Sequence, residues 1–127
     1  MRSLNKVMLI GHLAADPELR QTKKGTPVAN FSLATNRDWQ TDSDEAKKAT
    51  DFHRIVAWRK LAEIVSKYLT KGMAIYVEGR LTNRSYEDKD GNKKYITEIV
   101  CSELNMLSYK KNKEGVEQLE VKDPELK

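Results

Sequence analysis

One segment of this chain has helical periodicity, and it stands between segments with the character of strands. Its apolar residues recur at the spacing of one helix face: Leu61, Ala62, Ile64, Val65, Tyr68 and Leu69. Gly72 follows this stripe, and we expect it to end the helix because glycine readily adopts the left-handed conformation. With one short helix among several strands, the chain is expected to be mainly β.

Short apolar stretches bounded by turn residues predict five strands. These stretches cover residues 5–14, 28–35, 51–58, 73–82 and 94–107, the fourth continuing toward Tyr86. The polar stretch from 36 to 50 has no periodicity and predicts a long loop. Asp90-Gly91 predicts a type I′ hairpin turn, in which both central residues have positive φ.

The order of elements is strand, strand, strand, helix, strand, strand. This order, with its closing hairpin, is typical of a small barrel that has the helix at one end. It matches the five-stranded Greek-key barrel of the oligonucleotide/oligosaccharide-binding (OB) fold. At 127 residues the chain has room for one such domain, expected at residues 1–109. The charged segment 110–127 is expected to be a disordered tail.

Composition excludes several classes of protein. Cys101 is the one cysteine, which excludes a disulfide scaffold and a multi-cysteine zinc or iron–sulfur site. No run approaches the ~20 apolar residues that span a bilayer, and the N-terminus has no secretory signal pattern. We therefore expect a cytoplasmic protein without a cofactor.

The charge is unevenly distributed along the chain. The net charge is +4, from 23 basic and 19 acidic residues. Segment 110–127 is neutral and segment 38–51 carries −3, so the remainder holds 16 basic against nine acidic groups. This bias is compatible with a polyanionic partner and equally with an ordinary soluble surface.

Alternation along two strands separates aromatic and basic side chains from apolar ones. One face of residues 51–58 holds Phe52, Arg54, Val56 and Trp58, and the other holds His53, Ile55 and Ala57. One face of residues 75–86 holds Ile75, Val77, Gly79 and Leu81, and the other holds Tyr76, Glu78, Arg80, Thr82, Arg84 and Tyr86. Trp39 lies beside Arg37 in a polar stretch and is expected to be exposed.

Aromatic rings next to arginines suit a nucleic acid. Rings stack on bases without reading sequence, and guanidinium groups neutralise phosphate. Each aromatic could instead belong to the core, and arginines on an outer strand face are usually only solvated. The combination of these residues, rather than any one of them, favours a nucleic-acid groove.

Several runs with collinear spacing resemble the bacterial single-stranded DNA-binding protein family. They are NKVMLIGHL (5–13), DPELR (16–20), VANFSLAT (28–35), DFHRIV (51–56), KLAE (60–63), YLTKG (68–72) and YVEGRL (76–81). The resemblance covers about residues 5–107. It implies an OB-fold protein, usually a homotetramer, that wraps single-stranded DNA during replication, recombination and repair, in the cytoplasm at the nucleoid.

The resemblance also assigns residue roles. It places base stacking at Trp39, Phe52, Trp58 and Tyr86. Phosphate contacts are expected from eight basic residues: Lys6, Arg20, Arg37, Arg54, Lys60, Lys71, Arg80 and Arg84. His53 matches a histidine used at a subunit interface, and Tyr76 is expected there too.

This chain departs from the family at two places. Arg59 stands where the family usually has glycine, which adds charge beside the stacking site. The final residues, 121–127, lack the family's acidic tip with a terminal phenylalanine. Docking of replication and repair proteins through such a tip is therefore in doubt.

Two other classes of function compete with single-stranded DNA binding. Asp88, Asp90 and Asn92 resemble the start of a calcium loop, but Lys93 occupies the position that needs glycine. The sequence has no phosphate loop, nucleophile elbow or paired-histidine motif, so an enzyme is not expected. An OB domain that binds RNA or docks proteins stays open, because stacking and phosphate contacts barely distinguish DNA from RNA.

Overall fold

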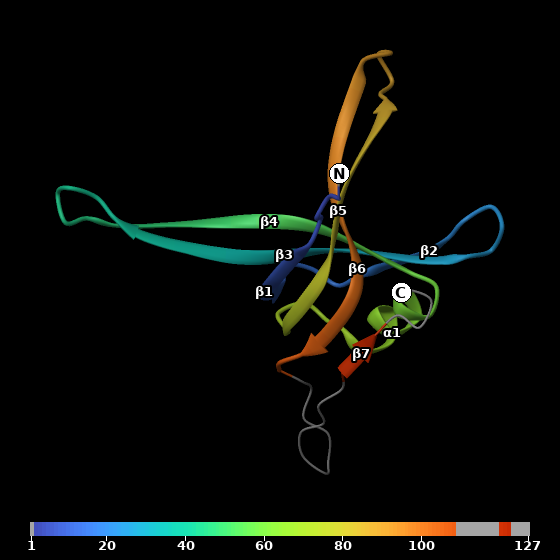
Figure 1. The fold of residues 1–127 in the computed structure, drawn as a ribbon, viewed down its shortest axis with the longest axis horizontal. Coiled ribbons are helices and arrows are strands. Elements are labelled where there is room, and N and C mark those ends of the chain that lie inside the picture. Colours follow the sequence, from blue (N-terminus) through green and yellow to red (C-terminus); the bar gives the residue numbers. More distant parts are fainter. Residues whose placement is uncertain (1, 109–119, 123–127) are drawn as a thin grey trace, which may run out of the picture.

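The computed structural model describes residues 2–108 and 120–122, and most of this chain is strand (Figure 1). Its elements are β1 (Val7–Leu13), β2 (Glu18–Gln21), β3 (Pro27–Gln40), β4 (Ala46–Trp58), α1 (Lys60–Tyr68), β5 (Ala74–Glu87), β6 (Lys93–Met106) and β7 (Glu120–Lys122).

The sheet closes on itself to form a barrel. Its strands follow the order β1-β5-β6-β4-β3-β2, and pairing of β1 with β3 joins the two sides. The contact between β4 and β6 is parallel, at Ile55–Ile99 and Val56–Val100, whereas the other pairs are antiparallel. The five predicted strands correspond to β1, β3, β4, β5 and β6, and the helix lies between the third and fourth of these, as predicted.

The core fills the barrel and the space beneath α1. Helix α1 buries Leu61, Ala62 and Val65 of the predicted stripe, and Leu69 after it is buried too. Ile64 is half-buried, whereas Tyr68 was predicted on this face but is 44% exposed. Burial of a side chain the size of Leu61 or Val65 contributes roughly 1.5–3 kcal/mol. Gly72 was expected to end the helix, and this was wrong. Leu69 is the C-cap in an extended conformation, and Gly72 (φ 91°) lies in the following turn, where its N–H donates to Leu13 O.

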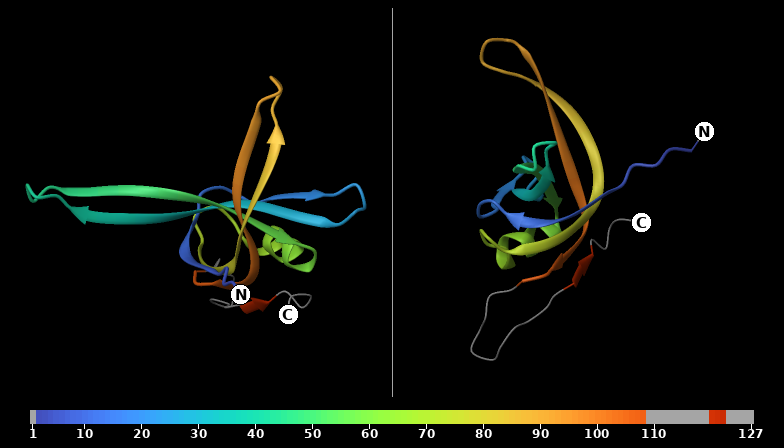
Figure 2. Two further views of the ribbon diagram at one scale, coloured as in Figure 1. Left: turned by 45° about the horizontal axis from the view of Figure 1, so that its top comes forward. Right: turned by 90° about the vertical axis from the view of Figure 1, so that its left-hand side faces the viewer.

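The prediction of a long loop over residues 36–50 was wrong. Strand β3 continues to Gln40 and β4 begins at Ala46, so the two form a ribbon that projects from the barrel (Figures 1 and 2). Cross-strand bonds hold this β3–β4 arm, such as Arg37 Nε to Asp51 Oδ2 at 2.7 Å. Most of its residues are exposed, so its sequence has no apolar alternation to reveal the strands.

Three hairpin tips share one turn geometry. The three loops are Thr22–Thr26, Thr41–Glu45 and Asp88–Asn92. In each loop the N–H of the first residue donates to the carbonyl of the fifth, and the N–H of the fourth residue donates to the carbonyl of the first. The fourth residue has positive φ each time: Gly25, Asp44 and Gly91. Asp90 is not among the described residues with positive φ, so the predicted type I′ turn was wrong. A three-residue loop with a left-handed last residue replaces it.

Two further differences from the sequence-based predictions also arise because the residues concerned are exposed. The short strand β2 was not predicted, because all four of its residues are exposed and leave no buried face to recognise. Leu81 was predicted to face the core but is exposed. It lies beyond Gly79 on the part of β5 that leaves the barrel to form the β5–β6 arm (Figure 2).

A β-bulge marks the place where β5 and β6 leave the barrel wall. Glu78 is opposite Glu103 but Gly79 is opposite Cys101, so Ser102 is an extra residue on β6. A Cβ atom at Gly79 would lie 2.1 Å from the carbonyl oxygen of Val100, so the backbones can approach only because this residue is glycine.

The segment 110–127, predicted as a tail, is described only in part. Glu120–Lys122 form β7, which pairs with residues 103–105 of β6. Residues 110–119 and 123–127 lie outside the described residues. The division of the chain after residue 109 stays a prediction.

We predict that Gly79→Ala lowers the free energy of unfolding by about 1–3 kcal/mol, because the added methyl group forces the β5 and β6 backbones apart. Urea unfolding followed by circular dichroism measures this change. Ser85→Ala, on the exposed part of the same strand, is the control and should change stability by less than about 0.5 kcal/mol. Equal stability of the two variants would show that the close approach is not a constraint.

Candidate nucleic-acid interface

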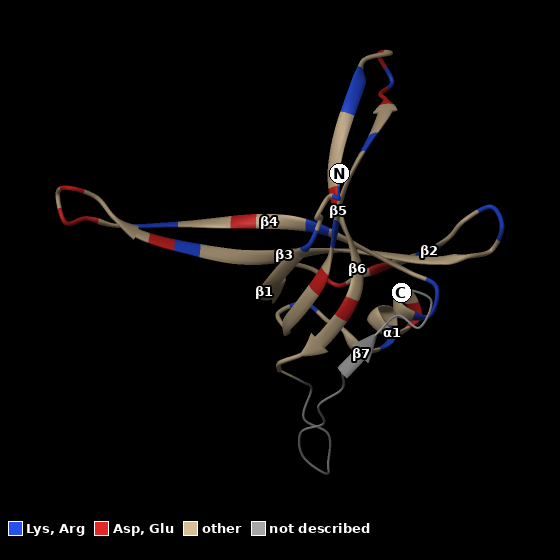
Figure 3. Ribbon diagram, in the orientation of Figure 1, with Lys and Arg blue, Asp and Glu red and all other residues tan. Residues whose placement is uncertain are grey.

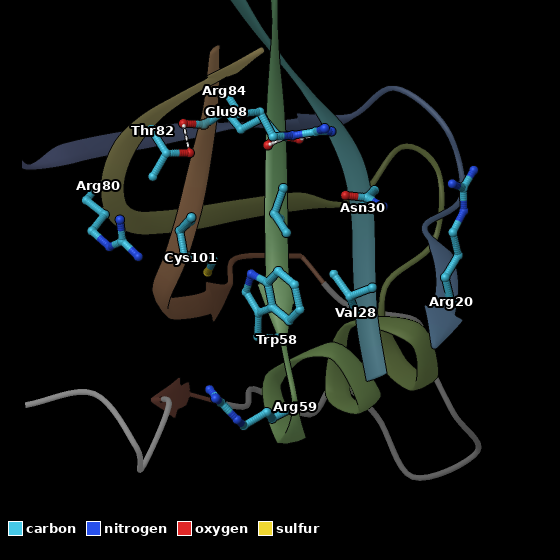
Figure 4. Close-up of a pocket in the computed structure, with 12 residues that line it drawn as sticks. Arg20, Val28, Asn30, Trp58, Arg59, Arg80, Thr82, Arg84, Glu98 and Cys101 are labelled. Carbon is cyan, nitrogen blue, oxygen red and sulfur yellow. Dashed lines mark hydrogen bonds and ion pairs between the residues drawn. The ribbon is translucent and has the colours of Figure 1, made fainter. Parts of the chain in front are cut away.

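An open groove of about 770 Å³ lies beside Trp58, at the end of β4 (Figure 4). We call it the Trp58 groove. Its walls come from β2 through β6 and the residue that precedes α1. The lining residues are Arg20, Val28, Asn30, Val56, Trp58, Arg59, Arg80, Thr82, Arg84, Glu98, Val100 and Cys101.

Strand register brings these residues to one side of the sheet. Val28 is opposite Trp58 on β3 and β4, and Arg80 is opposite Val100 on β5 and β6. The bulge at Ser102 shifts the alternation of β6, so that Val100 and Glu98 share the face of Arg80 and Thr82. A half-buried indole therefore lies between apolar side chains and guanidinium groups.

The groove has four arginines and one acidic residue, Glu98. The Glu98 carboxylate is 8% exposed and accepts bonds from Arg84 Nε at 2.8 Å and Nη2 at 3.4 Å. These bonds raise the pKa of Arg84 above its ordinary value. Because the pKa of Arg84 is raised, any stability that the ion pair contributes is fully present below the ordinary pKa of arginine. That stability is lost only as the pH rises through the raised pKa. The pair therefore persists at physiological pH.

The other arginines differ in their partners. Arg20 pairs with Glu18 at 2.9 Å, but both side chains are exposed and such pairs contribute little. Arg80 is exposed and has no acidic partner within 4 Å in the part of the chain that the structure describes. Arg80 is thus a cation in the groove whose charge no described carboxylate neutralises.

Two smaller grooves continue the Trp58 groove at either end. One, of about 380 Å³, contains Phe52 and Arg54 and shares Asn30 with the Trp58 groove. The other, of about 350 Å³, contains Lys6 and shares Arg80 and Val100. We call the three together the groove path. Phe52 is 66% exposed, so one open aromatic lies at the start of the path and Trp58 lies in its middle.

The other two predicted stacking residues lie on the arms. Trp39 is exposed near the end of the β3–β4 arm, with the Arg37 guanidinium 5.6 Å from its ring centroid. Side chains alternate along β3, so Trp39 lies on the same face as Leu33, which pairs with His53. Phe52 pairs with Ala34, on the opposite face. Tyr86 is exposed on the β5–β6 arm, opposite Lys94. The four aromatics therefore do not share one groove.

Charge also changes along the arms. The tip of the β3–β4 arm is acidic, whereas basic residues lie on both arms between their tips and the barrel (Figure 3). A polyanion would therefore find cations on the inner parts of the arms and repulsion at one tip.

Comparison with known proteins shows the family to which this chain belongs. The model of the single-strand binding protein family matches residues 4–107. The chain belongs to this family. It is 56% identical over 110 residues to single-stranded DNA-binding protein 1 of Chlorobaculum tepidum, covering 86% of this chain and 68% of that one. For single-stranded DNA-binding protein 1 of Xylella fastidiosa the identity is 46% over 117 residues, covering 91% and 86%.

A solved structure confirms the fold. This chain is similar to Plasmodium falciparum SSB in its complex with ssDNA, with a TM-score of 0.77 and 40% identity. The match covers 84% of this chain and 97% of the other. The resemblance and the OB barrel expected from the sequence are both confirmed.

The remaining predicted residues lie in several places. Lys6 lines the end of the groove path and lies 3.5 Å from Glu78. Lys60 and Lys71 are exposed at and after α1, and neither lines the path. Their phosphate contacts, like those of the other basic residues, stay predictions.

The two residues predicted for a subunit interface have partners within the chain. His53 Nε2 lies 2.8 Å from Thr35 Oγ1. The Tyr76 hydroxyl donates to Glu78 Oε1 at 2.8 Å, and this bond is the main cause that raises the pKa of Tyr76 above its ordinary value. Their place at an interface stays a prediction.

Sequence reasoning missed Asn30 and Glu98 as groove residues. Alternation along residues 28–35 could have found Asn30, since it separates Val28 and Asn30 from the core residues Ala29 and Phe31. No such signal exists for Glu98, because the bulge breaks the alternation of β6.

Residues 2–108 and 120–122 hold no cluster of three or more His, Cys, Asp or Glu side chains suited to a metal ion. Among the described residues, no helix has both the length and the apolar character to cross a membrane.

We predict that Glu98→Gln lowers the free energy of unfolding by about 1–3 kcal/mol, because a hydrogen bond to a buried charge becomes a neutral one. Thermal or urea denaturation measures the loss. Glu87→Gln, an exposed carboxylate on the same arm, is the control and should have little effect. An unchanged Glu98→Gln variant would mean that the pair with Arg84 contributes nothing to folding.

Proposed function

We propose that this protein binds single-stranded DNA with little sequence preference and coats it during replication, recombination and repair, in the cytoplasm at the nucleoid. The observation that supports this most directly is the half-buried Trp58 indole in an open groove with Arg80, which has no described acidic partner. Two sequence relatives are named single-stranded DNA-binding proteins, and the similar solved structure is an SSB in complex with ssDNA.

Binding would combine two interactions. Bases stack on Phe52 and Trp58, at about 1–3 kcal/mol per base, and only unpaired bases offer both faces for this. Arg54 and Arg80 neutralise phosphates and release counterions, which adds affinity at low salt. Trp39 and Tyr86 extend the binding surface along the two arms, so a strand longer than the groove path can continue over them.

Binding, rather than catalysis, is the proposed role. The relatives are DNA-binding proteins, and the groove residues account for stacking and charge neutralisation without a reactive group. Turnover of a single-stranded oligonucleotide in the presence of a divalent metal would contradict this.

Trp58→Ala should weaken binding of an oligothymidine by about 1–3 kcal/mol, or roughly 5- to 150-fold, because one stacked base loses its platform. Fluorescence anisotropy of a labelled oligonucleotide measures the affinity. Tyr68→Ala removes an exposed aromatic outside the groove path and is the matched control. If both variants bind like the parent protein, the stacking role of Trp58 is wrong.

The same titration with oligouridine and with duplex DNA, each at two salt concentrations, distinguishes the alternatives. The proposed function requires tight oligothymidine binding that weakens with salt, and weak duplex binding. Stronger oligouridine binding would favour an RNA-binding role. Weak binding of all three would favour a protein-docking module.

We also propose that the protein is a homotetramer, as the family resemblance implies. On the outer face of β1, Met8 and Ile10 are 61% and 64% exposed, and Ile10 is opposite Tyr76 on β5. Pairing of β1 with β3 involves His12 and Leu13, so, among the described residues, 7–10 have no strand partner on this edge. An apolar face with an open strand edge suits a second copy of this chain.

Ile10→Lys should therefore reduce the sedimentation coefficient, because a buried charge would disfavour the contact between copies. Analytical ultracentrifugation measures this. Leu19→Lys, at an exposed apolar residue on β2, is the control and should sediment like the parent. A parent protein that sediments as a monomer would contradict the proposed assembly.

A further inference from the structure

Arg59 has a backbone conformation that is rare for an arginine. It lies between β4 and α1 with φ 57° and ψ −128°. Side chains with a Cβ atom rarely adopt this region, whereas glycine enters it freely. A non-glycine residue persists there only when the surrounding structure imposes the conformation.

Hydrogen bonds on both sides of Arg59 impose this backbone. Its N–H donates to the carbonyl of Pro27 at 2.8 Å, which ties the end of β4 to the start of β3. Its carbonyl accepts the N–H of Glu63 at 3.2 Å, which begins α1. Its side chain makes no capping bond to the helix, so α1 begins through backbone bonds that any residue at this position could make.

The side chain of Arg59 lines the Trp58 groove, next along the chain from the indole (Figure 4). Arg20, Arg80 and Arg84 line the same groove, so Arg59 adds a fourth guanidinium to a surface that gathers positive charge.

We propose that Arg59 is a phosphate-binding residue of the Trp58 groove, and that backbone strain is accepted here because it puts a guanidinium on the residue that follows the stacking indole. This inference rests on the proposed function. The ligand group is the phosphodiester adjoining the base stacked on Trp58, which a planar guanidinium can bind through two hydrogen bonds.

The inference predicts opposite effects on stability and on binding from one substitution. Arg59→Gly relieves the strain and removes the charge, so its urea midpoint should rise while its affinity for oligothymidine falls several-fold. The slope of log affinity against log salt should become shallower by about 0.7 for each phosphate that the variant no longer binds. An oligothymidine short enough to contact one protomer keeps this count simple.

Two matched variants separate strain from charge. Arg59→Ala keeps the unfavourable φ and removes the charge, so it should bind as weakly as Arg59→Gly without its gain in stability. Arg59→Lys keeps both the charge and the φ, so it should retain most of the salt slope and show no gain in stability.

The results that overturn the proposal are specific. If Arg59→Gly and Arg59→Ala bind with the parent's affinity and salt slope, Arg59 does not bind phosphate. If Arg59→Gly is no more stable than Arg59→Ala, the backbone is not strained. Failure of the parent protein to bind oligothymidine, or indifference to Trp58→Ala, would instead count against the proposed function itself.

Discussion

The close approach of β5 and β6 at Gly79 is the constraint on which the rest of the structure depends. A Cβ at this position would collide with the Val100 carbonyl, and close by on β6 the bulge at Ser102 changes which side chains face outward. The start of β5 and the end of β6 belong to the barrel wall and have buried residues. The end of β5 and the start of β6 form an exposed arm. The same irregularity brings Val100 and Glu98 to the groove face, so closure of the core and construction of the binding surface have one origin.

Electrostatics in the groove is a balance between cations and one buried acid. Glu98 holds Arg84 in a fixed position but also neutralises it, whereas Arg80 has no acidic partner among the described residues. A surface that coats DNA must bind tightly and still release, and partial neutralisation moderates an otherwise strongly attractive groove. At position 59 the family usually has glycine and this chain has arginine. In the proposed role, Arg59 increases the positive charge of the groove at the cost of backbone strain.

The sequence predicted those elements that have one buried face. Most of the α1 stripe and the alternation of Ile55 with Ala57 are found in the structure, because burial imposes a period on the sequence; Tyr68, at the end of the helix, is the exposed exception. The β3–β4 arm and β2 escaped prediction because both are exposed and have no such period. In the site, alternation correctly placed Trp58 with Arg54, but it could not show that Trp39 lies on the other side of the ribbon or that Glu98 faces the groove. Those facts depend on register and on a bulge, which are set by contacts distant in sequence.

In the proposed complex, unpaired nucleotides lie along the groove path, with a base on Trp58 and phosphate at Arg80. The most direct measurement is a heteronuclear NMR titration of the ¹⁵N-labelled protein with oligothymidine, following the Trp58 indole N–H and the Arg80 Nε–H. We expect both signals to shift together and to saturate at the same oligonucleotide concentration. If both stay unmoved at saturation while signals of α1 or of the outer face of β1 shift, the nucleotides bind elsewhere and the proposed complex is wrong.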